Sequence, residues 1–287
     1  MVGIDPISSA EKAGAAMSTG NLALRVTSAL ILAPLALLSA YVGGWPFAVF
    51  WGITALAVLW EWITLVVGPG YRVMMSTCAA ATAIADVLAW LGRPVTALLM
   101  IALGALAGAI FAPREHRLWV MAGVGYAGGM VLAPVFLRAD DDYGFFVILF
   151  LFAVVWTTDI LGYFAGRAFG GPKLLPVVSP KKTWSGAIAG TIGAGAVALF
   201  GAAQFGSVNR IAIVALALVL SVMAQAGDLF ESWVKRQFNA KDSSRLIPGH
   251  GGVMDRLDGF WAAAVAGCVV GLLRGGFDEP ARGLLMW

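Results

Sequence analysis

The sequence has little charge, two cysteines and two histidines. Asp, Glu, Lys and Arg make up 12% of its 287 residues, whereas charged residues are about a quarter of soluble domains. Hydrophobic residues make up 60%, and the mean hydropathy is +0.86. This composition excludes an ordinary soluble domain and predicts a polytopic integral membrane protein. A net charge of +3 is too small to favour a nucleic-acid partner.

The cysteines argue against a disulfide or metal pair, and the N-terminal segment argues against a cleaved signal peptide. Cys78 and Cys268 both fall inside apolar runs, so we interpret them as packing residues and not as a disulfide or metal pair. The first twenty residues lack a basic cluster, and the apolar run 22–40 is long for the core of a signal peptide. We therefore expect this run to be a retained first membrane span.

Apolar runs predict an all-α protein with about nine transmembrane helices. The expected spans are 22–43, 45–67, 73–91, 95–112, 118–137, 145–166, 185–204, 209–230 and 256–274. The last span has an uncharged core of only 14 residues, 260–273, a length that a re-entrant segment could also have.

The lysines and arginines predict the orientation. With a cytoplasmic N-terminus, fourteen of them lie on the cytoplasmic side and five on the other, as the positive-inside rule favours. We therefore predict a multi-pass protein of the inner (plasma) membrane whose active site faces the cytoplasm. The predicted regions are a tail (1–21), an N-terminal membrane region of about five helices (22–137), and a catalytic region of about four helices (138–287) with cytoplasmic polar loops at 167–184 and 231–255.

A dense charged segment, 227–259, separates two apolar runs and holds ten charged residues. Asp228, Glu231 and Lys235 would share one face of a helix, and Asp255 and Asp258 repeat the i, i+3 spacing further on. Carboxylates brought together from two helix ends suit Mg²⁺. The alternative is a solvated loop, but Asp228 and Glu231 follow the apolar run without a turn. The predicted metal ligands are Asp159, Asp228, Glu231 and Asp255.

A second polar segment, 157–186, contains the run SPKKTWSG just before an expected helix. Lysines beside a helix N-terminus form an anion site that suits phosphate. Asp159 lies in the last turns of an apolar segment, where a charge indicates function. The alternative is that the two lysines only set the topology. The predicted phosphate-binding residues are Ser179, Lys181, Lys182 and Thr183 of this run, together with Lys241 and Arg256 of the charged segment 227–259.

Glu61 and Asp86 are weaker candidates. Glu61 lies between two tryptophans near the predicted cytoplasmic interface, and interfacial anchoring explains the tryptophans but not the glutamate. Asp86 is an intramembrane carboxylate without an obvious partner.

The segment 232–258 reads S-W-V-K-R-x4-K-D-x-S-x2-L-I-P-G-H-G-G-V-x-D-R-L-D. It resembles the signature of the phosphatidate cytidylyltransferases (CDP-diacylglycerol synthases). The segment 159–184 is similar to the same family's D-x-x-A-Y-F-x-G-R-x-F-G…S-P-K-K-T-W pattern. Gly162 replaces an alanine of that pattern, and Ser185 stands where a larger polar residue is common. The first five spans resemble the family only in hydrophobicity and in the run RVTSALILAP (25–34).

The resemblance implies that CTP and phosphatidic acid in the bilayer give CDP-diacylglycerol and pyrophosphate. It also implies Mg²⁺ held by Asp228 and Asp255, and a second, monovalent cation such as K⁺. A homodimer is compatible with the glycine-rich spans. The predicted catalytic residues are Asp228, Lys235, Arg236, His250, Asp255 and Asp258, with Asp242 nearby.

Three alternative functions remain open: two enzymes with similar motifs and a transporter. A CTP-dependent kinase of polyprenol or phytol type would use a lipid alcohol as acceptor, and a cytidylyltransferase for isoprenoid ether lipids would use a different lipid phosphate. A transporter would place its charges near the middle of the membrane, in paired broken helices, whereas here they cluster at one predicted face of the C-terminal half.

Overall fold

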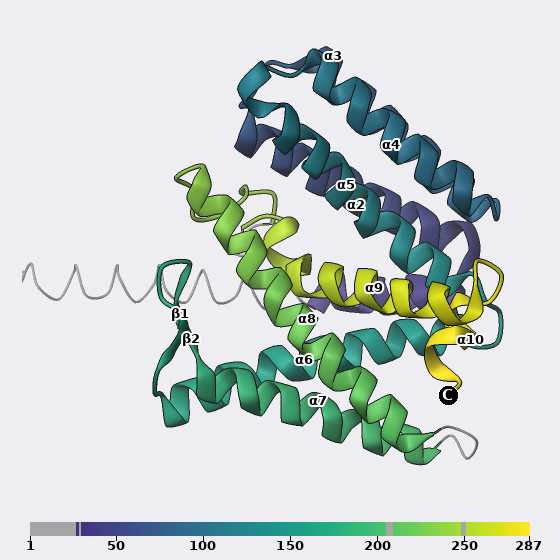
Figure 1. The fold of residues 1–287 in the computed structure, drawn as a ribbon, viewed down its shortest axis with the longest axis vertical. Coiled ribbons are helices and arrows are strands. Elements are labelled where there is room, and N and C mark those ends of the chain that lie inside the picture. Colours follow the sequence, from purple (N-terminus) through teal and green to yellow (C-terminus); the bar gives the residue numbers. More distant parts are fainter. Residues whose placement is uncertain (1–26, 29, 205–208, 248–250) are drawn as a thin grey trace, which may run out of the picture.

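A computed structural model describes residues 27–28, 30–204, 209–247 and 251–287. It is built almost entirely of helices (Figure 1). The labelled elements are α2 (Gly44–Val66), α3 (Arg72–Trp90), α4 (Pro94–Phe111), the short 3₁₀ helix η1 (Arg114–His116), α5 (Arg117–Arg138), α6 (Gly144–Phe169), β1 (Lys173–Leu175), β2 (Ser179–Thr183), α7 (Trp184–Gln204), α8 (Arg210–Gln237), α9 (Met254–Gly275) and α10 (Pro280–Leu285).

Eight helices of the described chain are long and apolar enough to cross a membrane. They match the second to ninth predicted spans, and the prediction of an all-α polytopic membrane protein is confirmed. The ninth predicted span is one continuous helix, α9, of 22 residues. A shorter apolar helix, Leu30–Val42, lies within the first predicted span, part of which falls outside the described residues.

The two predicted polar loops contain more regular structure than expected. Residues 173–183 form an antiparallel hairpin of β1 and β2, and α8 continues to Gln237, well into the predicted loop 231–255. The longer helix has two physical causes. Glu231 and Lys235 form an i, i+4 ion pair, and Lys235 and Arg236 in the last turn favour the negative end of the helix dipole.

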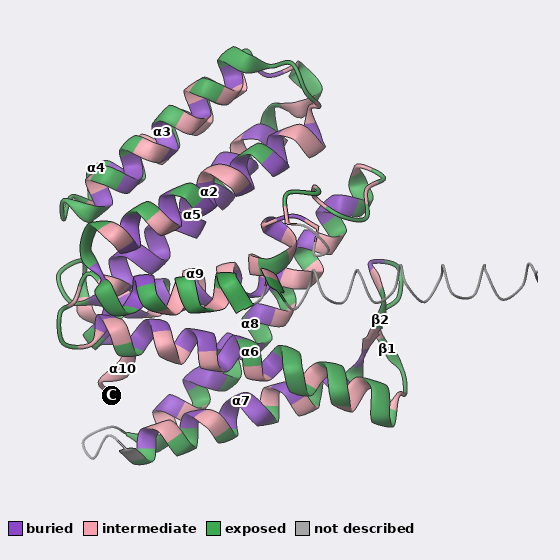
Figure 2. Cartoon of the chain, turned by 180° about the vertical axis from the view of Figure 1, so that it is seen from behind, coloured by how far each residue is buried: buried purple, intermediate pink, exposed green. Residues whose placement is uncertain are grey.

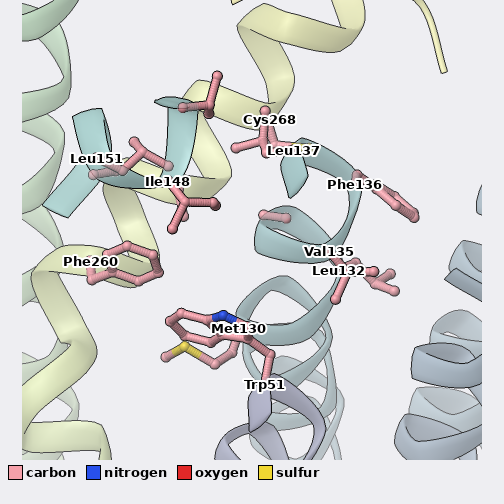
Figure 3. Close-up of a cluster of buried hydrophobic side chains, with 14 of the residues drawn as sticks. Trp51, Met130, Leu132, Val135, Phe136, Leu137, Ile148, Leu151, Phe260 and Cys268 are labelled. Atoms are coloured by element: carbon pink, nitrogen blue, oxygen red, sulfur yellow. The ribbon is translucent and has the colours of Figure 1, made fainter. Parts of the chain in front are cut away.

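The core lies where α2, α5, α6 and α9 meet (Figure 3). Trp51 and Phe152 each stack on Phe260 with ring centroids 4.9 Å apart. Cys268 is buried in this core, and Cys78 is buried beside α4. Both cysteines are free, as the sequence predicted.

Exposed residues run along the outer faces of the helices (Figure 2), and many of the exposed side chains are large and apolar. On α4, only Ala97, Gly104 and Gly108 are buried, while Leu99, Leu103 and Ile110 are exposed. Large apolar side chains on an outer face are stable when lipid surrounds them.

Helices α6 and α7 pack closely because glycines line their contact. A Cβ atom on Gly186 would meet Gly166 Cα at 3.3 Å, and a Cβ atom on Gly162 would meet the Gly186 carbonyl oxygen at 3.5 Å. Small residues let membrane helices approach in this way. This packing brings the C-terminal end of α6 beside the hairpin and the start of α7.

Candidate active site

A cavity of about 770 Å³ lies between the ends of α6, α7, α8 and α9 and the base of the hairpin. It joins the two polar segments that the sequence singled out. Ten of the predicted site residues line it: Asp159, Lys181, Lys182, Thr183, Asp228, Glu231, Lys235, Asp255, Arg256 and Asp258. Asp242 lines it as well.

Four predicted site residues lie elsewhere or are not described. Ser179, Arg236 and Lys241 are not among the lining residues. Arg236 instead donates to the Ala240 carbonyl oxygen over 2.8 Å. His250 lies outside the described residues, so its predicted role stays a prediction.

Lys235 is the centre of a buried ion triad. Its Nζ atom lies 2.6 Å from Glu231 Oε2 and 2.6 Å from Asp255 Oδ1. The three side chains are 9%, 1% and 5% exposed, in the order Lys235, Glu231 and Asp255. A charge buried this deeply is stable only when it is paired, so the lysine ties the end of α8 to the start of α9.

Asp255 also holds the loop that precedes α9. Its Oδ2 atom accepts hydrogen bonds from Ser243 N at 3.0 Å, Ser243 Oγ at 3.0 Å and Gly252 N at 2.8 Å. Its Oδ1 atom accepts from Lys235 Nζ. Asp255 therefore organises the loop through Oδ2 and binds Lys235 through Oδ1.

Glu61, which sequence reasoning left unexplained, anchors the same loop from α2. Its side chain is fully buried. Oε1 accepts from Ser244 Oγ at 2.6 Å and Val253 N at 2.8 Å, while Oε2 accepts from Met254 N at 2.7 Å. Ser243 Oγ lies 3.1 Å from Oε2 and 3.0 Å from Asp255 Oδ2, so the two carboxylates share its one hydroxyl proton. A carboxylate at the N-terminus of α9 also complements the helix dipole. The N-terminal half of the chain therefore helps to build the site.

Gly252 shows why this loop needs glycine. A Cβ atom there would lie 2.6 Å from Glu61 Oε1 and would overlap Ser243 Oγ. At Gly252, the backbone therefore lies directly against two side chains of the protein itself, those of Glu61 and Ser243.

Lys182 on β2 forms an ion pair with Asp228 on α8. Both side chains are partly exposed, at 28% and 32%, and both face the cavity. This pair is the direct link between the basic and the acidic segment. Asp228 also lies within electrostatic range of Asp159 and Asp258.

The N-terminus of α7 is partly capped by the protein itself. Trp184 N donates to the Pro172 carbonyl oxygen over 3.0 Å, and Gly186 N donates to Thr183 Oγ1 over 3.2 Å, a typical N-cap. Ser185 Oγ donates to the Gly170 carbonyl oxygen. The predicted anion site therefore depends on Lys181 and Lys182 more than on the Trp184 and Gly186 amides.

A polar network that reaches the cavity lining through Thr158 and Gln225 was not predicted. Thr158 and Ser221 hydroxyls lie 2.7 Å apart, and Gln225 Nε2 donates to Thr191 Oγ1 over 2.9 Å. These residues join α6, α7 and α8 inside the bundle. Small polar side chains within apolar runs are the sequence signal for such contacts, although the sequence alone does not pair them.

Comparison with known proteins decides the family. The model of the cytidylyltransferase family matches residues 23–273. The chain belongs to the cytidylyltransferase family. It is therefore a nucleotidyltransferase and a multi-pass membrane enzyme, which confirms the resemblance seen in the sequence and excludes the transporter.

Curated relatives match much of the chain. The phosphatidate cytidylyltransferase of Brucella abortus biovar 1 (strain 9-941) is 43% identical over 272 residues, which cover 91% of this chain and 96% of that protein. The phosphatidate cytidylyltransferase of Rickettsia felis is 32% identical over 194 residues, 58% of this chain and 85% of that protein. That of Rickettsia bellii is 41% identical over 143 residues, 45% of this chain and 62% of that protein.

The formal charges of the side chains that line the cavity sum to zero. The acidic members are Asp159, Asp228, Glu231, Asp242, Asp255 and Asp258. The basic members are Arg167, Lys173, Lys181, Lys182, Lys235 and Arg256. A nucleoside triphosphate would add further negative charge to the cavity. Its binding here would therefore favour the binding of an additional cation.

The carboxylates that line the cavity are suited to bind Mg²⁺ as this additional cation. Among the described residues, no group of three or more His, Cys, Asp or Glu side chains is arranged to hold a metal by itself. Mg²⁺ does not need such a cage, because it is usually held by one or two carboxylates, substrate phosphates and water. Asp228 and Asp255, which line the cavity from two helices, provide that kind of donor set.

Lys182→Met should strongly impair nucleotidyl transfer. It removes the cation that pairs with Asp228 at the cavity, and losing one preorganised group of this kind costs on the order of 10²-fold in rate. Steady-state kinetics with varied nucleotide would measure the effect. Lys241→Met is the matched control, because Lys241 does not line the cavity; an equal loss in both variants would contradict this assignment of the phosphate site.

Proposed function

We propose that this protein transfers the cytidylyl group of CTP to phosphatidic acid and so forms CDP-diacylglycerol and pyrophosphate. The observation that carries the proposal is the 43% identity, over 91% of the chain, to a protein named phosphatidate cytidylyltransferase. The cavity supports it, because one lining combines lysines and carboxylates at the ends of membrane helices.

The chemistry needs little acid–base catalysis. The phosphate of phosphatidic acid is already an anionic nucleophile at neutral pH, so the main barrier is the approach of one anion to another. The protein must neutralise and align the reactants. Lys181, Lys182 and Arg256 line the cavity and would screen the phosphates during attack of the lipid oxygen on the α-phosphate of CTP, as its bond to pyrophosphate breaks.

The acidic side of the cavity has a different role. Asp228 and Asp255 would hold Mg²⁺, with Asp159 and Glu231 close to the same space. When bound, this ion supplies charge neutralisation for the nucleotide phosphates and the departing pyrophosphate. Lys235 would keep Asp255 and Glu231 in place through the two ion pairs of the triad.

The two substrates require a site at the membrane boundary, since CTP is water-soluble and phosphatidic acid remains in the bilayer. The charged cavity lies at the ends of helices long enough to span the membrane. We propose that this end faces the cytoplasm of the cell, at the inner membrane, in line with the distribution of lysine and arginine.

The test is an acceptor panel with purified protein in lipid nanodiscs, CTP and Mg²⁺. We expect phosphatidic acid to give CDP-diacylglycerol and equimolar pyrophosphate, and diacylglycerol or polyprenol to give no lipid product. Asp228→Asn should abolish turnover, whereas Asp278→Asn, which changes an exposed carboxylate outside the cavity, should not. Turnover with a lipid alcohol, but none with phosphatidic acid, would overturn the proposal.

A further inference from the structure

The tip of the β1–β2 hairpin exposes apolar side chains outside the cavity. Val177 is 87% exposed and Leu175 is 41% exposed, and Pro176 between them is exposed too. Hairpin turns that face water usually carry Gly, Asn, Asp or Ser. The hairpin tip, residues 175–178, has none of these, which indicates an apolar environment.

The base of the hairpin is expected at the membrane boundary. It connects α6 to α7, and both helices are long enough to cross a membrane. Exposed aromatic side chains surround this base: Tyr163 is 61%, Phe169 80% and Trp184 53% exposed. Belts of tyrosine and tryptophan mark the interface between membrane and water.

The hairpin does not extend far from that boundary. Figure 1 shows it turned across the ends of α6 and α7, not continuing along their axes. Its longer strand, β2, has 5 residues, which span about 16 Å at the usual strand rise. The tip is therefore within reach of the head-group region.

The charges on the strands between the tip and the base of the hairpin favour an anionic surface. Lys173, which pairs with Thr183 at the base, and Lys181 are both exposed. An apolar tip with flanking lysines is the pattern of interfacial membrane binding, in which apolar burial adds to attraction by anionic lipids. We propose that the hairpin tip inserts into the head-group region of an anionic bilayer.

The inserted tip would hold the lysines of the hairpin over lipid phosphates. β2 carries Lys181 and Lys182, both of which line the cavity, so this anchoring would present them to the head group of a lipid substrate. This consequence rests on the proposed function, whereas the insertion itself does not. The tip would then act as a positioning element for the lipid and not for the soluble nucleotide.

Spin labelling tests insertion without any assay of activity. A nitroxide on Val177→Cys would be compared with one on Glu115→Cys, an exposed site in the α4–α5 connection; both native cysteines are buried. In nanodiscs containing phosphatidylglycerol, we expect the label at 177 to be more accessible to oxygen than to a water-soluble nickel complex, and the label at 115 to show the reverse. Equal exposure of both labels to the nickel complex would overturn the proposal, and equal insertion in purely zwitterionic nanodiscs would overturn the role of the lysines.

Kinetics then test the consequence for the lipid substrate. Leu175→Ser combined with Val177→Ser should raise the apparent KM for phosphatidic acid severalfold and leave the KM for CTP unchanged. Val177→Leu, which keeps the tip apolar, should behave as the original protein. An unchanged KM for the lipid would contradict the positioning role. If the protein used another lipid acceptor, kinetics with phosphatidic acid would fail while the labelling result stood.

Discussion

Lys235→Met is expected to cause the largest loss of stability of any single substitution in the site. The lysine is the shared partner of Glu231 and Asp255, so its removal leaves two buried carboxylates without their cation. Breaking a buried ion pair by removing one partner costs about 3–5 kcal/mol. Thermal unfolding in nanodiscs, followed by near-UV circular dichroism, would measure the loss.

Asp255→Asn is the informative control for this substitution. It leaves a neutral Glu231–Lys235 pair and should therefore destabilise the protein less than Lys235→Met. Activity should nevertheless be lost, because the amide cannot accept at both former carboxylate oxygens and lacks the negative charge of the carboxylates that usually hold Mg²⁺. Equal melting temperatures for the two variants would contradict the view that Lys235 is the central charge of the triad.

Glu61→Gln should loosen the loop before α9 and lower the turnover rate at least tenfold. Each carboxylate oxygen accepts a hydrogen bond from a backbone N–H, so a Gln amide necessarily points its NH₂ group at one of these donors. An unsatisfied buried donor costs about 1–3 kcal/mol. Hydrogen–deuterium exchange over residues 240–254 would detect the change.

The matched control is Glu115→Gln, which changes an exposed glutamate outside the cavity. It should alter neither exchange in the loop nor turnover. Because Glu61 lies on α2, far in sequence from the loop it binds, faster exchange around 240–254 would be direct evidence of this long-range contact. Unchanged exchange in Glu61→Gln would contradict the anchoring role.

The sequence was sufficient to predict site residues that lie close together along one helix. Asp228, Glu231 and Lys235 share a face through helical spacing alone, and all three line the cavity. Their position directly after an apolar run also indicated a site at the membrane boundary. The helices themselves follow from long apolar runs, so their bounds differ from the predictions mainly where polar residues continue a helix, as at the end of α8.

The sequence could not predict contacts between distant segments. Glu61 offered only an unusual charge between two tryptophans, and its hydrogen-bond partners are residues about 180–190 positions later. The hairpin was missed for a different reason, since its strands of three and five residues are too short to show an alternating pattern. Arg236 and Lys241 were assigned to the site as members of the signature segment 232–258, but they are not among the residues that line the cavity.

The position of the label in CTP tests the central claim most directly. Purified protein in nanodiscs with phosphatidic acid and Mg²⁺ would be given CTP labelled either in the α-phosphate or in the γ-phosphate. Our account predicts that the α-label enters the lipid and that the γ-label leaves as pyrophosphate. A lipid that carries the γ-label but not the α-label would identify a CTP-dependent kinase and contradict the account.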